Sequence, residues 1–136
     1  MTNLVNVSEG SFLALHGLAL IAQRNPDRVN IKTLAGILQA SEAHLAKVFQ
    51  KLSKADLVKS VRGPAGGFVL DQPAEEISFL DIFEIIEGKV VLGDCPFGKT
   101  NCSFNSCIFN MELNRISQEI YDSFKNIKLS DFQNHI

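Results

Sequence analysis

The sequence predicts a mainly α-helical protein with one small β-hairpin, an α+β chain in which helices dominate. Two short segments with helical spacing of apolar residues follow each other between residues 30 and 55. A glycine-rich hairpin, residues 57–70, comes directly after them. A long apolar stripe at helical spacing covers residues 108–127. These three observations fix the fold class.

The two short helices begin at Asn30 and Ser41, whose side chains can cap free backbone amides, and Gln39–Ala40 breaks the chain between them. Apolar residues recur three or four positions apart: Leu34, Ala35 and Leu38 in the first helix, and Leu45, Val48, Phe49 and Leu52 in the second. Two helices joined by so short a turn form a helix-turn-helix, whose second helix can enter a DNA major groove.

The second helix carries polar and basic residues on another face: Ser41, His44, Lys47, Lys51 and Lys54. Such groups suit base edges and phosphate oxygens. A lysine-rich face is also typical of a helix that is simply exposed to water. Helix-turn-helix units that bind no DNA occur as well.

The hairpin combines the alternating segment Leu57–Arg62 with the apolar segment Phe68–Leu70. Three glycines and a proline between them favour a tight turn that brings backbone amides close to another surface. A helix-turn-helix followed by such a wing is a winged helix. Residues 44–63 hold five basic side chains against one acidic one, a local charge of +4, although the whole chain has a net charge of −2. Positive charge is therefore concentrated where phosphate would be met.

The most specific motif is Val61-Arg62-Gly63-Pro64-Ala65-Gly66-Gly67, and Leu34–Ala35, Leu45–Leu52, Ala55–Val58 and Glu76–Ile82 add to it. From about Ser8 to its end, the chain resembles the Rrf-type winged-helix transcriptional regulators. That family contains repressors of iron–sulfur assembly, nitric-oxide response and cysteine metabolism. The resemblance implies a homodimer that binds a pseudo-palindromic operator in double-stranded DNA. It also implies, for several members, an iron–sulfur cluster as the sensor.

The chain of 136 residues, 46% of them hydrophobic, fits one compact domain with a real core. No apolar run approaches the ~18 residues of a membrane span, and the first residues lack a signal-peptide pattern, so we expect a cytoplasmic protein without membrane contact. Within the domain we expect a winged-helix DNA-binding part (1–88), a cysteine-rich sensor loop (89–107), and a dimerisation helix with a tail (108–136).

The three cysteines, Cys95, Cys102 and Cys107, fall within thirteen residues of loop-like sequence. Their odd number in a reducing compartment argues against a disulfide framework. The spacing lets three thiolates converge on one soft metal centre, and the absence of a Cys-x-x-Cys pair disfavours a zinc ribbon. The resemblance favours an iron–sulfur cluster, 2Fe–2S first. Metal-free thiol oxidation ranks second, and zinc or inert cysteines third.

A cluster with three cysteine ligands needs a fourth ligand. In one branch of the family a histidine three residues after the last cysteine completes the site, but here that position is Asn110, a poor ligand for iron. The resemblance also offers a first-helix side chain of the partner subunit, and His16 matches one such histidine. Glu9 is a nearby acidic candidate, but it is out of register, because the matching carboxylate position is Phe12. A small molecule as ligand, or no fourth ligand, stays open, and the simpler interpretation of His16 is a hydrogen-bonded residue at a packing or subunit boundary.

Three further helices are predicted. Ser8 should cap a helix that stops at Asn25–Pro26, and Ser78 should cap Phe79–Glu87, which Gly88 ends. The last helix should begin near Ile108 and run for about five turns. Its apolar stripe consists of Phe109, Leu113, Ile116, Ile120, Phe124 and Ile127. A long stripe after a completed winged helix suits a dimer seam, although part of it should pack on its own domain.

The favoured function is a homodimeric DNA-binding transcriptional regulator, with repression ranked before activation and the choice between them left open by the sequence. Its cluster or redox state would bias the dimer geometry and thereby the affinity for the operator. The side chains expected to meet DNA are Ser41, His44 and Lys47 at base edges, and Lys51, Lys59, Arg62 and Gly63 at phosphates or the minor groove. The alternative is a cluster-free winged-helix regulator that responds to thiol oxidation, a small-molecule effector or a partner enzyme.

Two other classes of function fit the sequence less well. The sequence holds no catalytic constellation, so we expect no enzyme. A thiol oxidoreductase would need a resolving cysteine beside a nucleophilic one, and no Cys-x-x-Cys precedes a helix. A protein-interaction module, whose winged helix binds a metabolic enzyme, would show DNA binding that is insensitive to salt.

Overall fold

The computed structural model describes residues 2–64, 66–93, 95, 97–99 and 102–133. The elements follow in the order α1 (Glu9–Arg24), α2 (Ile31–Leu38), α3 (Glu42–Lys54), β1 (Val58–Val61), β2 (Gly67–Leu70), the 3₁₀ helix η1 (Ala74–Glu76), α4 (Phe79–Glu87), α5 (Glu112–Asn126) and the 3₁₀ helix η2 (Leu129–Phe132). Ala65 of the wing motif, and Asp94, Pro96, Thr100 and Asn101 of the cysteine loop, lie outside the described residues. Within these ranges no helix has the length and apolarity to span a membrane. The predicted mainly helical fold with one small hairpin is confirmed.

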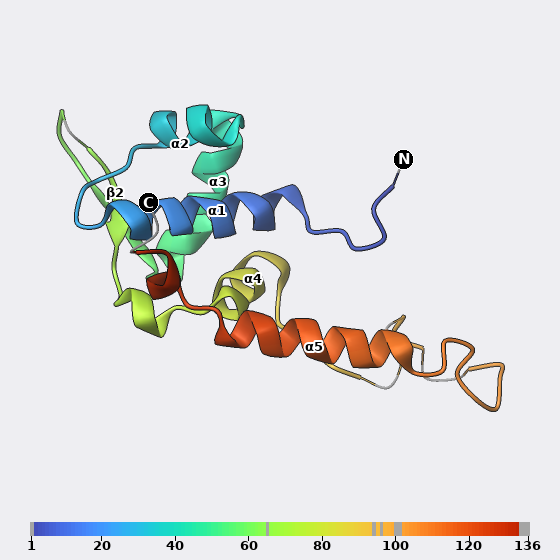
Figure 1. Ribbon diagram of the computed structural model, residues 1–136. Helices are drawn as coiled ribbons and strands as arrows, with labels where there is room; N and C mark the ends of the chain where they lie inside the picture. The colour runs from blue at the N-terminus through green and yellow to red at the C-terminus, as the bar shows by residue number, and fades with distance from the viewer. Residues whose placement is uncertain (1, 65, 94, 96, 100–101, 134–136) are drawn as a thin grey trace.

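Helix α1 lies at the centre of the fold and contacts α2, α3, α4, β2 and η2 (Figure 1). Its buried face joins α2 and α3 in one hydrophobic core, to which the largest contributions come from Leu13, Leu18, Ile21, Leu34, Leu45, Phe49 and Leu52. Burial of each such side chain stabilises the fold by about 1.5–3 kcal/mol. Gly17 permits the close approach of α1 and α3, since a Cβ there would lie 3.1 Å from the ring of Phe49.

The helix-turn-helix forms as its capping residues predict. The Thr33 N–H donates to Asn30 Oδ1 at 2.7 Å, and the His44 N–H donates to Ser41 Oγ at 3.0 Å. Each side chain thus satisfies an amide that the first helical turn leaves free. Gln39 adopts the left-handed conformation (φ 53°) and ends α2, so the chain can turn directly into α3.

The wing is a two-stranded antiparallel sheet, with Val58 opposite Leu70 and Val61 opposite Gly67. A backbone bridge ties its base to the connection between α1 and α2, because Val29 and Phe68 exchange hydrogen bonds of 3.1 and 2.8 Å. The Phe68 ring also packs against Phe49 of α3, with ring centroids 5.0 Å apart. Figure 1 shows the rest of the wing projecting away from the helices.

At each glycine of the wing, a different steric constraint disfavours a residue with a side chain. Gly63 has φ +119°, a conformation that side chains disfavour. A Cβ at Gly66 would lie 2.8 Å from the Val61 carbonyl oxygen, and a Cβ at Gly67 would lie 2.8 Å from the Val29 carbonyl carbon. The glycine-rich motif is therefore required by the turn and by the docking of β2 beside Val29.

The prediction for the cap of α4 is confirmed, whereas the prediction for the start of α5 is not. The predicted capping box is confirmed, since the Asp81 N–H donates to Ser78 Oγ and the Ser78 N–H to Asp81 Oδ2, both at 3.0 Å. The expected start of the last helix near Ile108 is wrong. Asn110 and Met111 have positive φ angles of 52° and 60°, which interrupt a helix, so α5 begins at Glu112. Its 15 residues make about four turns.

The tail after α5 returns to the core, which its sequence did not indicate. Leu129 is fully buried, and its N–H donates to the Ile77 carbonyl oxygen at 3.0 Å. Phe132 stacks on Phe79 of α4 with ring centroids 5.5 Å apart. The tail thus fixes the C-terminal end of α5 to the winged helix.

The end of α4 is fastened to the start of α1 through Glu87. Its carboxylate accepts hydrogen bonds from the Ser8 hydroxyl and, at 2.7 Å, from the buried Ser11 hydroxyl. These hydrogen bonds, that of Ser8 first, and the charge of Lys51 on α3 lower the pKa of Glu87. We call Ser8, Ser11 and Glu87 the clasp. It joins α1 and α4 at the point where the cysteine loop begins.

We expect Gly67→Ala to lower the free energy of unfolding by about 1–3 kcal/mol, because the new methyl group would overlap the backbone of Val29. Urea denaturation followed by circular dichroism measures this. Gly36→Ala in α2 is the control. No described atom lies within 4 Å of a Cβ there, and alanine should stabilise the helix by about 0.5–1 kcal/mol. Equal changes in the free energy of unfolding for Gly67→Ala and Gly36→Ala would contradict the close docking of β2 beside Val29.

We expect Glu87→Gln to destabilise the protein at neutral pH and to lose this effect in acid. The pKa of Glu87 is lower in the folded state than its ordinary value of 4.5, so its contribution is present above pH 4.5 and is lost as the pH falls through the folded-state pKa. Urea denaturation between pH 7 and pH ~3 should therefore show a gap between wild type and variant that closes below pH 4.5. The control, Glu75→Gln at an exposed position of η1, should change the free energy of unfolding little. A gap unchanged in acid would contradict the role of the clasp.

Candidate functional site

Helix α3 presents a face to solvent that only partly coincides with the face expected from the sequence. Between Glu42 and Lys54 the exposed residues are Glu42, Ala43, Ala46, Lys47, Gln50, Lys51 and Lys54. Ser41 is the N-cap, with its hydroxyl bound to the His44 amide, and the His44 residue is half-buried. The structure therefore brings Lys47, Lys51 and Lys54 to the surface as expected, and it places Ser41 and His44 at the margin of this face.

Sequence reasoning missed the exposed residues Ala43, Ala46 and Gln50 of α3. A signal for them was present, because residues 43, 47, 50 and 54 are spaced i, i+4, i+7 and i+11, a stripe opposite the buried Leu45 and Phe49. The basic residues, on which the prediction depended, mark only part of this stripe.

A groove separates α3 from the wing. It is an open cavity of about 620 Å³, and its lining residues are Ile31, Ala46, Phe49, Gln50, Ser53, Lys54, Ser60 and Phe68. The hydroxyls of Ser53 and Ser60 and the ammonium of Lys54 give this groove donors on both sides. The groove therefore joins the exposed face of α3 to the wing, with polar groups on both sides of a partly apolar floor.

The predicted wing contacts are all exposed, but their surroundings differ. Arg62 and Gly63 lie at the end of β1, where the wing projects from the helices. Lys59 forms an ion pair with Asp71 at 3.8 Å, and its side chain is 60% exposed. Exposed pairs of this kind contribute little stability, so the Lys59 ammonium stays available to a phosphate. Lys51 lies on the other side of α3 from the groove, near the Glu87 carboxylate on which its charge acts.

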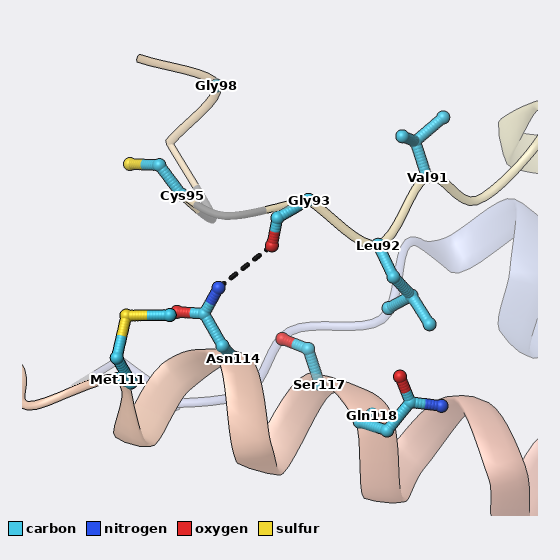
Figure 2. Close-up of a pocket in the computed structure, with 9 residues that line it drawn as sticks. All are labelled: Val91, Leu92, Gly93, Cys95, Gly98, Met111, Asn114, Ser117 and Gln118. Atoms are coloured by element: carbon cyan, nitrogen blue, oxygen red, sulfur yellow. Dashed lines mark hydrogen bonds between the residues drawn. The ribbon is translucent and has the colours of Figure 1, made fainter. Parts of the chain in front are cut away.

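The cysteine loop leaves α4 at Gly88 and runs beside the first turns of α5 (Figure 1). The Asn114 side-chain amide donates to the Gly93 carbonyl oxygen at 2.8 Å and ties the loop to α5 (Figure 2). Next to this bond lies a cavity of about 510 Å³ whose lining residues include Val91, Leu92, Cys95, Met111 and Ser117. This hydrogen bond thus holds the loop against α5 at Gly93.

The three cysteines carry free thiols, of which Cys102 is exposed and Cys95 and Cys107 are half-buried. Backbone hydrogen bonds from Lys99, first, and Phe97 lower the pKa of the Cys95 thiol, assisted by the charge of Lys99. Such an environment favours the thiolate, the form that binds metals and reacts with oxidants.

The described residues do not form a ligand set within one chain, since they contain no group of three His, Cys, Asp or Glu side chains able to hold a metal ion. Glu9 is exposed in the first turn of α1. His16 is exposed as well, and its Nδ1 is bound to the Phe12 carbonyl oxygen at 2.8 Å, so Nε2 is the ring nitrogen that this hydrogen bond does not use. The chemistry of the donors fits an iron–sulfur cluster, because three soft thiols lie on one loop and one of them favours the thiolate.

Helix α5 keeps its apolar stripe largely uncovered, and none of its residues is buried. Phe124 near its C-terminal end packs edge-on against Phe79 and Phe83 of α4, with centroid distances of 6.0 and 5.8 Å. Farther toward the N-terminal end, Ile116 and Ile120 are 38% and 40% exposed. Part of the stripe therefore packs on its own domain, and the rest faces solvent.

Comparisons with known proteins agree with this architecture. Residues 7–135 match the profile of the Rrf2 family, which is described as an iron-dependent transcriptional regulator. The chain is 32% identical over 104 residues to the HTH-type transcriptional regulator NsrR of Oceanobacillus iheyensis, covering 75% of this chain and 71% of that protein. It is 31% identical over 124 residues to the HTH-type transcriptional regulator IscR of Cereibacter sphaeroides, covering 89% and 80%.

Solved structures show the same fold. IscR of T. potens superposes with a TM-score of 0.73 at 26% identity, covering 93% of this chain and 85% of that one. CymR, the global cysteine regulator of B. subtilis, superposes with a TM-score of 0.76 at 24% identity, covering 98% and 99%. A profile match over nearly the whole chain, with relatives above 30% identity, settles the family. The chain belongs to the Rrf2 family of iron-dependent transcriptional regulators.

Proposed function

We propose that this protein is a homodimeric DNA-binding repressor whose affinity for its operator depends on the state of the cysteine loop. The winged helix carries the proposal, since α3, the groove and the wing form one exposed surface rich in basic side chains. Positive charge on this surface, in a chain of net charge −2, is what binding to phosphate by counterion release requires.

The DNA contacts divide by position. Lys47 on α3 faces outward, toward the major groove that the helix would enter, and Lys54 borders the groove beside the wing, where a phosphate would lie. Ser41 at the N-cap and His44 beside it suit the edge of that groove. Arg62 and Gly63 of the wing suit the minor groove or the sugar-phosphate backbone. Two further cations, Lys51 and Lys59, would meet phosphates from either side of α3.

The dimer would form through α5. The exposed isoleucines Ile116 and Ile120 form an apolar stripe that one chain leaves in water, and burying them against a second copy removes this cost. A symmetric pair would present two α3 helices and two wings to a palindrome. This assigns residues 1–88 to DNA binding, 89–107 to sensing, and 108–136 to the dimer.

An iron–sulfur cluster, of the 2Fe–2S type, would be held by Cys95, Cys102 and Cys107. When bound, it supplies a centre that reacts with oxidants and nitric oxide. His16 or Glu9 of the partner subunit is the candidate for the fourth ligand, because both side chains are exposed on α1. The clasp at Glu87 would connect the loop to α1 and α4, since it lies directly before Gly88.

A cluster-free regulator is the second candidate. The lowered pKa of Cys95 favours it, because a thiolate reacts with peroxides and disulfides far faster than a thiol does. Oxidation of Cys95 to sulfenic acid, or to a disulfide with another loop cysteine, would then take the place of the cluster as the switch.

We expect the full-length protein to bind a palindromic duplex, selected from a random library, with two chains per duplex. Fluorescence anisotropy at several salt concentrations should show affinity falling linearly on logarithmic axes, because phosphate contacts release counterions. Arg62→Ala should weaken binding and reduce that slope by about 1. Lys125→Ala, an exposed lysine of α5, is the matched control and should leave the slope unchanged. Binding that does not respond to salt would contradict the proposal.

We expect protein purified without oxygen to absorb visible light and to contain iron and acid-labile sulfide in equal amounts. Alanine at Cys95, Cys102 and Cys107 together should remove all three signals, because the thiolates would be the principal ligands. His16→Ala and Glu9→Ala, measured separately, should identify the fourth ligand by a shifted spectrum. A colourless, iron-free wild type would refute the cluster, and mass spectrometry after peroxide treatment would then test oxidation at Cys95.

A further inference from the structure

We propose that Gln50 is the residue of α3 that reads a base pair, and that it selects an A·T pair at one position of each operator half-site. The inference rests on the proposed function, because it requires α3 to lie in the major groove. It replaces Ser41 and His44 as the principal base-reading residues.

The direction of Gln50 follows from the packing of α3. Leu45, Val48, Phe49 and Leu52 are buried and define the side of the helix that faces the core. Ala43, Lys47, Gln50 and Lys54 form the stripe on the opposite side, and all four are exposed. Gln50 lies about 10 Å along the axis from Ala43, roughly two turns into the helix, so it occupies the middle of the stripe.

The chemistry of this stripe singles out one side chain. Among the exposed residues between Glu42 and Lys54, the lysines only donate hydrogen bonds, Glu42 only accepts them, and the alanines do neither. Gln50 both donates and accepts. Adenine presents an acceptor at N7 beside a donor at N6 in the major groove, which a glutamine amide matches with two hydrogen bonds.

The neighbours of Gln50 support this role. Ala43 and Ala46 are the small exposed residues of the N-terminal half of α3, so they let the helix approach the base edges closely. Their methyl groups suit contact with the methyl group of thymine. Gln50 also borders the groove between α3 and the wing, where Ser53, Lys54 and Ser60 offer donors to a sugar-phosphate strand. Backbone contacts in the groove would therefore set the register in which Gln50 meets its base.

The test compares the sequences that the full-length wild type and its variants select from a random duplex library. Wild type should enrich an A·T pair at one position of each half-site. Gln50→Ala should lose that preference, by about 5- to 100-fold, and keep the preferences at the other positions. Gln50→Glu, which has the same shape but only accepts hydrogen bonds, should shift the preference to cytosine, whose N4 donates.

Lys54→Ala is the matched control on the same face. It should weaken binding to all sequences alike and lower the salt slope by about 1, as loss of a phosphate contact does. If Gln50→Ala behaves in this way, or keeps every base preference of the wild type, the role of Gln50 is wrong and the proposed function stands. If the wild type enriches no sequence, the proposed function itself fails.

Discussion

The fold depends on the position of one aromatic ring, that of Phe49. It is completely buried in α3, it lies against Gly17 of α1, and it packs on Phe68 of the wing. One side chain therefore contacts α1 and the wing at once and limits how closely α3 approaches each of them. The backbone bridge between Val29 and Phe68 also holds the wing against the helices. Gly67 allows this close contact because it has no Cβ that would overlap the Val29 backbone. The proposed DNA interface depends on it, because α3 and the wing can meet one duplex together only if their separation is fixed.

Local signals in the sequence predicted most elements of the winged helix. Asn30, Ser41 and Ser78 cap helices because a short polar side chain can reach an amide within its own turn, an interaction that needs no distant partner. The start of α5 could not be predicted in this way. Asn110 and Met111 adopt positive φ angles, which no local preference of methionine favours, so the surrounding structure must hold them there. The docking of Leu129 beside Ile77 joins residues far apart in the chain and was likewise invisible.

In the candidate site too, some residues were predictable from local sequence signals and others depend on tertiary packing. The sequence correctly located the exposed lysines of α3 and the wing, because helical spacing and the local charge of +4 over residues 44–63 mark a basic surface in a chain of net charge −2. It did not rank Gln50 above Ser41 and His44. Helical spacing already marked the outward stripe, but the ranking also requires knowledge of which side of α3 faces the groove, and that depends on tertiary packing. The cysteines were found by their clustering, but spacing alone does not decide whether they meet at one centre, and the described residues of a single chain hold no group of three ligands able to bind a metal ion.

The outward stripe of α3 has a consequence for how such regulators diversify. Gln50 and its exposed neighbours bury nothing and hold no cap, so their replacement leaves the core, the turn and the wing intact. Duplicated copies of the gene could therefore acquire new target sequences through changes on this one surface without losing thermal stability. Phe49 and Gly67 have no such freedom. The DNA sequence that is recognised can change while the helices and the wing that present the recognition residues stay the same.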